Sequence, residues 1–414
     1  MNILLVFHRI PYPLRSGYDK VVYNLIRTLS LAHRVTLLAP MDENTGREAV
    51  AHMRSLCHEL VTVPVKNRTA HIQRSKWLYT WRLLRLCLFR VPMYITNEEY
   101  PEVTGCLRQL CASQPYDIIQ GISIRTASSL QTVPHSFFRV SGPFDDSVES
   151  ARSELQVAPN WRKRWIFRME CRARSYYQPR ASSTSDRVFF FSQDDLRRIS
   201  DLAGGLPQAR VLPVAVEGDD ARRAANGFEE PDSLVFIGGL ASLFNQDAVQ
   251  YFYREIYPLI LKEVPRTRFY IVGQSPPQEI MNLGEPGKVI VTGSVPDVRP
   301  YIEQAAVYVA PIRAGTGIKT KMIEALSLGK AIVATRPALQ GLWDVDETVI
   351  QIRDHPEDFA RTVVELLGNK ALRMELGHKA RDLYERSYTF DKTAPKTLEV
   401  YSEIEEIIRK RKRN

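Results

Sequence analysis

Residues 311–335 read Pro-Ile-Arg-Ala-Gly-Thr-Gly-Ile-Lys-Thr-Lys-Met-Ile-Glu-Ala-Leu-Ser-Leu-Gly-Lys-Ala-Ile-Val-Ala-Thr. The order is strand end, glycine loop, helix, glycine and next strand, which is typical of one unit of an α/β fold. Gly315 and Gly317 allow the loop to adopt positive φ and to approach a ligand closely. A helix that begins near Lys319 directs free N–H groups and the positive end of its dipole at the loop, which favours a phosphate.

Three charged side chains accompany this loop. Lys319 and Lys321 add positive charge beside it, and Glu324 lies on the first turns of the helix, where a carboxylate can accept two hydrogen bonds from a sugar diol. A nucleotide sugar offers both a diphosphate and a ribose diol. The alternative is a plain βαβ crossover with a Lys321–Glu324 surface pair, worth at most ~0.5 kcal/mol.

The same rhythm of strand and helix extends over the whole chain. The expected strands are 2–7, 34–40, 59–65, 116–122, 137–142, 187–193 and 211–216, followed by 234–238, 268–273, 289–295, 307–312, 331–335 and 349–352. Short β-branched runs without alternation, separated by helices, indicate buried parallel strands. We therefore expect the α/β class, with two Rossmann-like domains.

The sequence predicts residues 1–206 as an N-terminal domain, completed by a C-terminal helix at about 388–414, and residues 207–387 as a second domain. Parallel sheets bind ligands at the carboxyl ends of their strands, so we expect two facing domains with a deep cleft between them. The basic tail 409–414 is predicted to be a solvated, frayed end.

Composition sets broad limits. A chain of 414 residues is long enough for two domains, and 44% hydrophobic with 25% charged residues is ordinary for a globular protein. The five cysteines form no CxxC pair, which favours a reducing cytoplasm, and no apolar run approaches the ~20 residues of a membrane span. A net charge of +9 suits anionic partners of many kinds.

Other nucleotide-binding and metal-binding motifs are missing from the sequence. No GxGxxG follows the first strand and no GxxxxGK[ST] occurs. The sequence also lacks a convincing cluster of metal ligands, so we expect no metal cofactor.

Two segments of the first half are candidates for contact with a second substrate, which would act as an acceptor. Asp145 and Asp146 follow a strand and can orient or deprotonate an acceptor, or can cap the next helix. His8, at the end of the first strand, is either a substrate contact or a loop residue.

The stretch 71–92 places Trp77, Trp81, Leu84 and Leu88 at helical spacing among basic residues. Such a helix can lie on an anionic membrane as a peripheral contact, or it can pack on the sheet with its arginines reaching solvent.

The chain resembles family 4 of the retaining glycosyltransferases, which have the GT-B fold. The resemblance is carried by 311–335, by the opening strand with its Ser-Gly loop, by 234–240 with the Asn-Gln-Asp-Ala that starts at Asn245, and by 291–298. It implies transfer of a sugar from a nucleoside diphosphate sugar to an acceptor, with retention of anomeric configuration. It also suggests a role in polysaccharide or glycoconjugate assembly.

The resemblance carries family roles onto matching positions. Glu324 matches the glutamate that holds the donor ribose, and Gly17 matches the N-terminal glycine loop. The donor-binding set that it implies is Gly17, Gly238, Gly239, Asn245, Val295, Gly315, Thr316, Gly317, Ile318, Lys319, Lys321 and Glu324. Val295 would mark the wall of the nucleobase. As catalytic groups we expect Lys319, because negative charge develops on the leaving diphosphate, together with Glu324 on the donor ribose and Asp145 on the acceptor.

Three departures from the family pattern accompany the match. Thr316 stands where the family has its first glutamate, and Asn245 and Asp247 stand where a basic pair is usual. The histidine that many relatives carry after a mid-domain strand is missing near 138–147.

Three other hypotheses stay open beside glycosyl transfer. A nucleotide-sugar epimerase would need no acceptor, and a catalytically inactive relative would bind nucleotide without turnover. A basic protein that binds nucleic acid would show steep salt dependence, but no nucleic-acid module is present and we expect no such partner.

Overall fold

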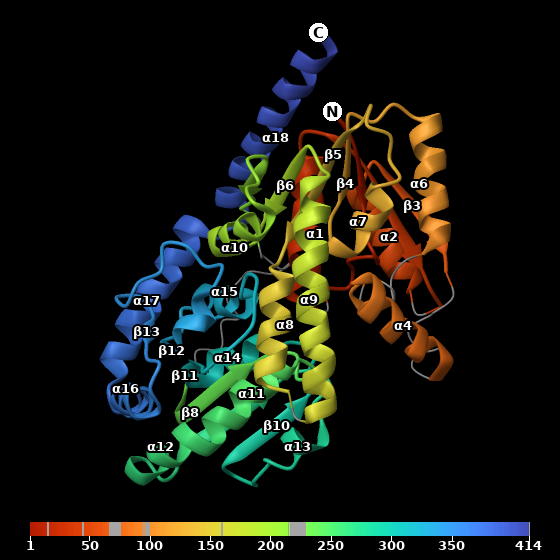
Figure 1. Cartoon of the computed structure of the whole chain (residues 1–414). Helices are drawn as coiled ribbons and strands as arrows, with labels where there is room; N and C mark the ends of the chain where they lie inside the picture. Colours follow the sequence, from red (N-terminus) through yellow and green to blue (C-terminus); the bar gives the residue numbers. More distant parts are fainter. Residues whose placement is uncertain are drawn as a thin grey trace. The chain divides into compact units, whose positions relative to one another are not determined.

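The computed structural model describes residues 1–413 apart from 15, 44, 66–75, 94, 96–99, 159, 214 and 216–228. The chain forms two compact units, each with its own sheet (Figure 1). The first unit comprises Met1–Ala215 and Thr393–Asn414, and the second comprises Val216–Lys392.

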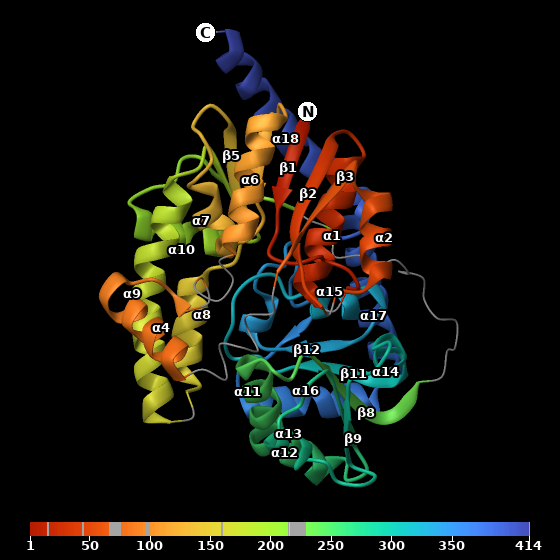
Figure 2. The ribbon, with the colours of Figure 1, turned by 90° about the vertical axis from the view of Figure 1, so that its right-hand side faces the viewer.

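The first unit is built on seven parallel strands in the order β3-β2-β1-β4-β5-β6-β7. The strands are β1 (Asn2–Val6), β2 (Arg34–Met41), β3 (Glu59–Pro64), β4 (Ile118–Gly121), β5 (Phe138–Phe144), β6 (Arg187–Phe190) and β7 (Ala209–Val211). The helices are α1 (Gly17–Ser30), α2 (Arg47–Leu56), α4 (Lys76–Phe89), α6 (Pro101–Ser113), α7 (Ala127–Leu130), α8 (Ser147–Gln156), α9 (Trp161–Ser183), α10 (Gln193–Ala203) and α18 (Phe390–Arg413). Helices cover both faces of this sheet (Figure 2).

The second unit has six parallel strands in the order β10-β9-β8-β11-β12-β13. The strands are β8 (Glu230–Ile237), β9 (Arg268–Val272), β10 (Val289–Gly293), β11 (Ala305–Ala310), β12 (Ile332–Ala334) and β13 (Gln351–Ile352). The helices are α11 (Leu243–Tyr251), α12 (Tyr257–Glu263), α13 (Gln278–Met281), α14 (Arg299–Gln304), α15 (Thr320–Ser327), α16 (Pro356–Gly368) and α17 (Lys370–Ser387).

Each sheet has one place where the order of its strands reverses. In the first unit β1 lies beside β4, and in the second unit β8 lies beside β11. The connections leave these neighbouring strands in opposite directions, so the loops that follow them separate and leave room for a ligand. These two edges position the candidate sites.

Burial explains why the strands form. Every residue of β11 is buried, as are Leu4 and Leu5 of β1, and strands covered on both faces favour continuous apolar runs. The expected α/β fold with two Rossmann-like domains is therefore confirmed at the level of strands and helices.

Two details of the expected division need correction. The boundary at 206/207 is wrong, because β7 pairs with β6 and so belongs to the first sheet. The tail was predicted to be frayed, yet α18 continues to Arg413. Arg411 forms an ion pair with Asp186 at 2.9 Å, and Lys412 forms one with Asp117 at 2.9 Å.

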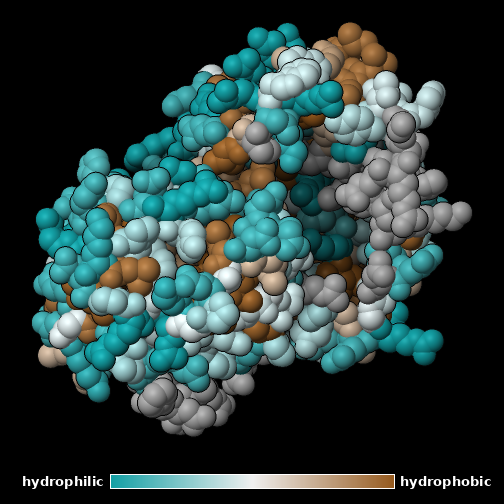
Figure 3. Space-filling view, turned by 90° about the horizontal axis from the view of Figure 1, so that it is seen from below, coloured by the Kyte–Doolittle hydropathy of each residue, from teal (hydrophilic) through white to brown (hydrophobic). Residues whose placement is uncertain are grey.

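The described part of the chain has no helix long and apolar enough to cross a membrane. The face drawn in Figure 3 is mainly hydrophilic, with hydrophobic residues in several separate groups.

Candidate functional site

The glycine loop after β11 has the backbone that the sequence predicts. Gly315 has φ 120° and Gly317 has φ 72°, and residues other than glycine rarely adopt this region of backbone conformation. Lys319 occupies the N-cap position of α15 and is only 9% exposed. Its Nζ donates to the carbonyl oxygen of Thr316 at 2.8 Å, which folds the lysine back over the loop.

Lys321 connects this loop to the one after β8. Its Nζ donates to Oδ1 of Asn245 at 2.5 Å and lies 4.8 Å from the centre of the Phe236 ring. Burial and repulsion from Lys319 lower the pKa of Lys321 to about 7, although the Glu324 carboxylate acts in the opposite direction. Lys321 therefore changes its charge near neutral pH and responds to any anion placed beside it.

Gly238 makes the approach of Lys321 possible. A Cβ atom at residue 238 would lie 2.8 Å from Nζ of Lys321 and 2.9 Å from the amide of Asn245. At Gly239 the nearest atom to such a Cβ is 3.9 Å away. The amide Nδ2 of Asn245 donates to the carbonyl oxygen of Gly239 at 2.8 Å, so this asparagine bonds both to the loop after β8 and to Lys321.

A second pair of residues joins α11 to the loop after β11. The guanidinium of Arg313 forms an ion pair with Asp247 at 2.5 Å and lies 4.3 Å from the centre of the Tyr251 ring. Asp247 belongs to α11 and Arg313 to the loop after β11. Where the resembled family usually has a basic pair, this chain therefore has Asp247, whose carboxylate holds Arg313 in place.

Glu324 lies one turn further along α15 and is half-buried. Burial raises the pKa of Tyr308, on β11, and the charge of Glu324 adds to that increase. The surface-pair alternative does not account for Lys321, whose ammonium donates to Asn245 on α11.

The remaining residues expected in the donor site flank this centre. Ile318 packs against Gly341, where a Cβ atom would lie 2.7 Å from the Cα of Ile318. Val295 is half-buried just after β10, which is separated from β8 by β9. Two strand spacings put it roughly 10 Å from the loop after β8, at the same edge of the sheet.

The first unit has a polar cluster at its own reversal, between β1 and β4. Nδ1 of His8 lies 3.3 Å from the Ser123 hydroxyl, and its Nε2 lies 3.3 Å from a guanidinium nitrogen of Arg125. Burial, with Arg125 and Arg9 beside it, holds the pKa of His8 well below its ordinary value. His8 is therefore neutral at physiological pH and is part of the edge of the sheet.

Gly17 begins α1 at this edge. Ser16 caps the helix by accepting from the backbone N–H of Asp19 at 3.1 Å, and Asp19 in turn accepts from Nε of Arg9 at 2.8 Å. The cap and the ion pair fix the loop that carries Gly17.

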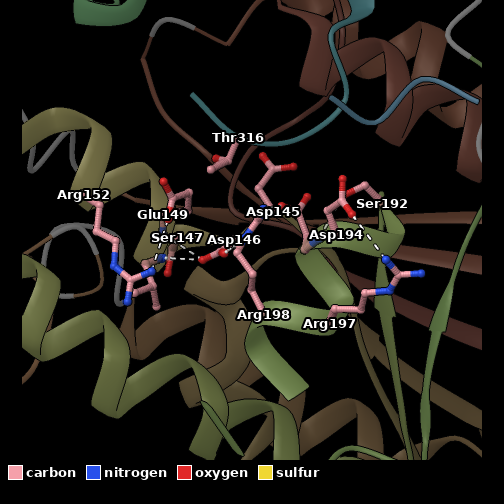
Figure 4. Close-up of polar contacts among 12 residues, drawn as sticks. Asp145, Asp146, Ser147, Glu149, Arg152, Ser192, Asp194, Arg197, Arg198 and Thr316 are labelled. Carbon is pink, nitrogen blue, oxygen red and sulfur yellow. Dashed lines mark hydrogen bonds and ion pairs between the residues drawn. The ribbon is translucent and has the colours of Figure 1, made fainter. Parts of the chain in front are cut away.

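The two aspartates after β5 have different positions. Asp146 is the N-cap of α8 and accepts from the backbone N–H groups of Val148 and Glu149 at 2.9 Å. It also forms an ion pair with Arg198 at 2.7 Å and is 1% exposed (Figure 4). The capping interpretation therefore holds for Asp146.

Asp145 remains the candidate for acceptor chemistry. It is half-buried, and its carboxylate adds to the increase that burial causes in the pKa of Tyr18. Tyr18 belongs to α1 and donates to the carbonyl oxygen of Ile122 at 2.7 Å. Asp145 thus belongs to the same edge cluster as His8 rather than to the cap of α8.

The basic aromatic stretch 71–92 is described from Lys76 onward, so residues 71–75 lie outside the described residues. The alternative in which this helix packs on the sheet is wrong for Trp77, Trp81, Leu84 and Leu88, because these side chains are exposed. Exposed fractions are 78% for Trp77, 41% for Trp81, 52% for Leu84 and 66% for Leu88. Helix α4 packs on α9 through its opposite side, where Leu86 is 2% exposed.

Sequence reasoning missed the apolar walls of the second-unit site. Phe236 underlies Lys321, and the ring of Phe244 lies 3.4 Å from a Cβ placed on Gly315. In the sequence Phe236 looks like any other core residue of a strand. Only its position on β8, beside the point where the strand order reverses, marks it as part of the site.

The comparisons with known proteins concern the fold and the class of protein. Residues 231–369 match the family model described as Glycosyl transferases group 1. No curated protein matches the chain in sequence.

Three solved structures are similar over nearly the whole chain. Sucrose-phosphate synthase from Thermosynechococcus elongatus has 16% identity and a TM-score of 0.68, covering 98% of this chain and 100% of that chain. TarM has 12% identity and a TM-score of 0.70, covering 97% and 98%. HepE from Anabaena, in complex with UDP and glucose, has 10% identity and a TM-score of 0.62, covering 97% and 99%.

At these identities the likeness establishes the fold, which is the GT-B fold of glycosyltransferases. The family match over 231–369 adds support for a glycosyltransferase as the class of protein, through the unit that carries the glycine loop and Lys321.

Proposed function

We propose that the chain is a retaining glycosyltransferase that moves a sugar from a nucleoside diphosphate sugar to a saccharide or glycoconjugate acceptor. The observation that carries this proposal is the convergence of two loops at the reversal of the second sheet. There Lys319 and Lys321 offer positive charge beside the backbone N–H groups of the glycine loop, and Glu324 offers a carboxylate close by.

The donor fits this cluster by chemistry. The diphosphate would bind between the amides of Gly315 and Gly317 and the ammonium of Lys321, because anions favour helix N-termini and lysines. Glu324 would accept from the ribose hydroxyls, and Val295 would contact the nucleobase. The HepE structure holds UDP and glucose, which supports a nucleoside diphosphate as the ligand.

The reaction breaks the bond between the anomeric carbon and the phosphate oxygen, and forms a bond from that carbon to an acceptor oxygen. Negative charge grows on the leaving diphosphate, so preorganised cations stabilise the transition state more than the ground state. Lys319 and Lys321 fill this role without a metal ion. In a retaining transfer the acceptor attacks from the face of the leaving group, and its proton passes to a phosphate oxygen.

The acceptor side is proposed for the first unit. Asp145 would orient the acceptor hydroxyl, while neutral His8 would serve as a hydrogen-bond partner. We further propose that the enzyme works in the cytoplasm, where nucleotide sugars are present, with peripheral contact to a membrane.

The test is thermal unfolding of the full chain in the presence of UDP, GDP, ADP or CMP. A ligand at 100 times its dissociation constant stabilises by ~2.7 kcal/mol, which raises Tm by roughly 5–10 °C for a domain of this size. One diphosphate should give this shift in the wild type, and Glu324→Ala should lose most of it.

The matched control is Glu365→Ala, which removes an exposed carboxylate from α16 of the same unit. It should keep the full shift. Equal loss in both variants, or no shift with any nucleotide, would reject the donor site.

Turnover then separates the competing enzymes. A glycosyltransferase releases nucleoside diphosphate in step with a new glycoside whose anomeric configuration matches the donor, and chelation with EDTA leaves the rate unchanged. A new nucleotide sugar formed without acceptor would favour an epimerase. Binding without any product would favour an inactive relative.

A further inference from the structure

A basic hollow lies in the first unit where α4, α8 and α9 meet. It has a volume of about 520 Å³ and is open to solvent. Its charged lining consists of Arg90, Arg152, Arg172 and Arg180. Glu149 pairs with Arg152 at 3.3 Å, and no other carboxylate among the described residues forms an ion pair with these four arginines. Arg180 also donates to the carbonyl oxygen of Tyr176 at 3.0 Å, but four guanidinium groups with a single carboxylate partner make a site for an anion.

Tyr176 organises this hollow. The guanidinium of Arg180 lies 3.6 Å from the centre of its ring, and that of Arg90 lies 5.3 Å from it. Two cations on one aromatic ring repel each other, so an anion shared between them would relieve the repulsion.

Arg90 is held in an uncommon backbone conformation. Its φ is 53°, in the left-handed region that costs energy for a residue with a side chain. The residue follows directly on α4, and this turn places its guanidinium over Tyr176 of α9. Strain of this kind is often maintained at binding sites, where the surrounding structure fixes it.

The exposed stripe of α4 leads to the same place. Trp77, Trp81, Leu84 and Leu88 are exposed along one side of the helix, and Phe89, 66% exposed, directly precedes Arg90. Arg85 lies over the Trp81 ring at 5.0 Å. An exposed apolar stripe of this length, with arginines beside it, is typical of a helix that lies in the interface of a bilayer.

We propose that the Arg90–Arg180 hollow binds the phosphate of an anionic phospholipid while the α4 stripe enters the lipid interface. Charge complementarity selects an anionic bilayer over a neutral one, because the arginines favour a headgroup whose phosphate charge no choline cation balances, and the aromatic side chains need an apolar layer. The contact is peripheral. The proposal goes beyond the sugar-transfer function and does not depend on the donor site in the second unit.

The experiment is sedimentation of the full chain with vesicles of phosphatidylcholine alone or mixed with phosphatidylglycerol. The wild type should bind the mixed vesicles and not the neutral ones. Two double variants test the two parts of the proposal. The hollow variant carries Arg90→Gln and Arg180→Gln, and the stripe variant carries Trp81→Gln and Leu88→Gln. Each should weaken binding by about tenfold or more.

The control is Lys370→Gln with Lys396→Gln, which removes the same charge from exposed positions on α17 and α18. It should bind within about twofold of the wild type if the hollow acts as a specific site. A loss equal to that of the hollow variant would show attraction by net charge alone and would overturn the proposal.

Three other results would also overturn it. Full binding by the stripe variant would remove the role of the lipid interface. Binding of inorganic pyrophosphate in the hollow without vesicle binding would identify a soluble anion as the ligand. A dimer that dissociates in the stripe variant, with no vesicle binding, would identify a second copy of the chain as the partner. All three variants should keep the wild-type circular dichroism spectrum and Tm, because every changed residue is exposed.

Discussion

Lys321 shows how a single side chain couples the proposed donor site to pH. An ammonium with a pKa of about 7 is only partly charged in the free protein at neutral pH. The charged groups that face it are Lys319 and Glu324, which act in opposite directions. A bound diphosphate would stabilise the ammonium and raise its pKa, so binding takes up a proton.

The affinity for a nucleotide sugar should therefore be highest below pH 7 and should decrease above it, by up to about tenfold per pH unit. Calorimetry between about pH 6 and pH 9 in buffers of different ionisation enthalpy measures both the affinity and the proton uptake. Lys321→Met should bind weakly and without this slope. An unchanged slope in the variant would assign the proton to another group.

The stability of the free protein should change in the opposite direction. The unfolded chain holds the proton of Lys321 up to its ordinary pKa of 10.5, whereas the folded protein releases it near 7. Between these values the unfolded state binds more protons, so this group makes the folded state more stable as pH increases.

Gly238 and Gly239 form a matched pair of adjacent residues. Gly238→Ala should push Lys321 away from Asn245 and weaken nucleotide binding by about tenfold or more, with a loss of stability of about 1–3 kcal/mol. Gly239→Ala has open space and should change binding much less. Thermal shifts with whichever nucleotide of the panel stabilises the wild type compare the two, and equal effects would contradict the role of the Gly238 contact.

At the scale of elements, the adjacent residues Asp145 and Asp146 together connect three helices. It caps α8 and pairs with Arg198 of α10, while Gln178 of α9 donates to the neighbouring carbonyl oxygen of Asp145 at 2.8 Å. Helix α8 packs along α9, so the cap fixes the pair that carries part of the arginine hollow.

Asp146→Ala should lower the free energy of unfolding by about 2–4 kcal/mol, because it removes a cap and leaves a partly buried arginine with one partner fewer. Asp145→Ala keeps the carbonyl that Gln178 uses and should cost under about 1 kcal/mol, while lowering turnover if it acts on the acceptor. Urea unfolding measures the first effect. A reversed order of stability would contradict the capping role.

At the scale of the whole molecule, the chain returns to its first unit to complete it. Helix α18 follows the second unit in sequence, yet residues from Thr393 belong to the first unit. Tyr401 is fully buried and donates to Oε1 of Gln120 on β4 at 2.5 Å, and the Thr397 hydroxyl donates to the carbonyl oxygen of Pro213. The first sheet therefore needs the last residues of the chain.

A chain that ends at Lys392 should lose the cooperative unfolding of the first unit. The buried side chains of α18, such as Tyr401 and Ile404, are worth about 1.5–3 kcal/mol each, and their sum approaches the stability of a domain. A chain that ends at Ile408 loses only exposed ion pairs of about 0–1 kcal/mol each and should unfold normally. Hydrogen exchange at β4 distinguishes the two, and equal protection in both would reject the role of α18.

The sequence by itself determined the strands, the order of helices and the glycine loop, because these depend on local properties. Buried parallel strands need continuous apolar runs, and the positive φ of Gly315 and Gly317 needs glycine. The sequence also indicated the stripe on α4 and the capping role of the aspartate pair, but left each beside an alternative.

Only the tertiary structure decided which residues meet. Lys321 and Asn245 are 76 positions apart, and their contact depends on β8 lying beside β11, which no local pattern specifies. The pKa of Lys321 follows from that burial. In the same way Arg90 and Arg180 share Tyr176 because α4 packs on α9, and the charges of a sequence do not show which of them will lie together. Local propensity fixes elements, whereas side chains distant in sequence meet only where the packing of those elements brings them together.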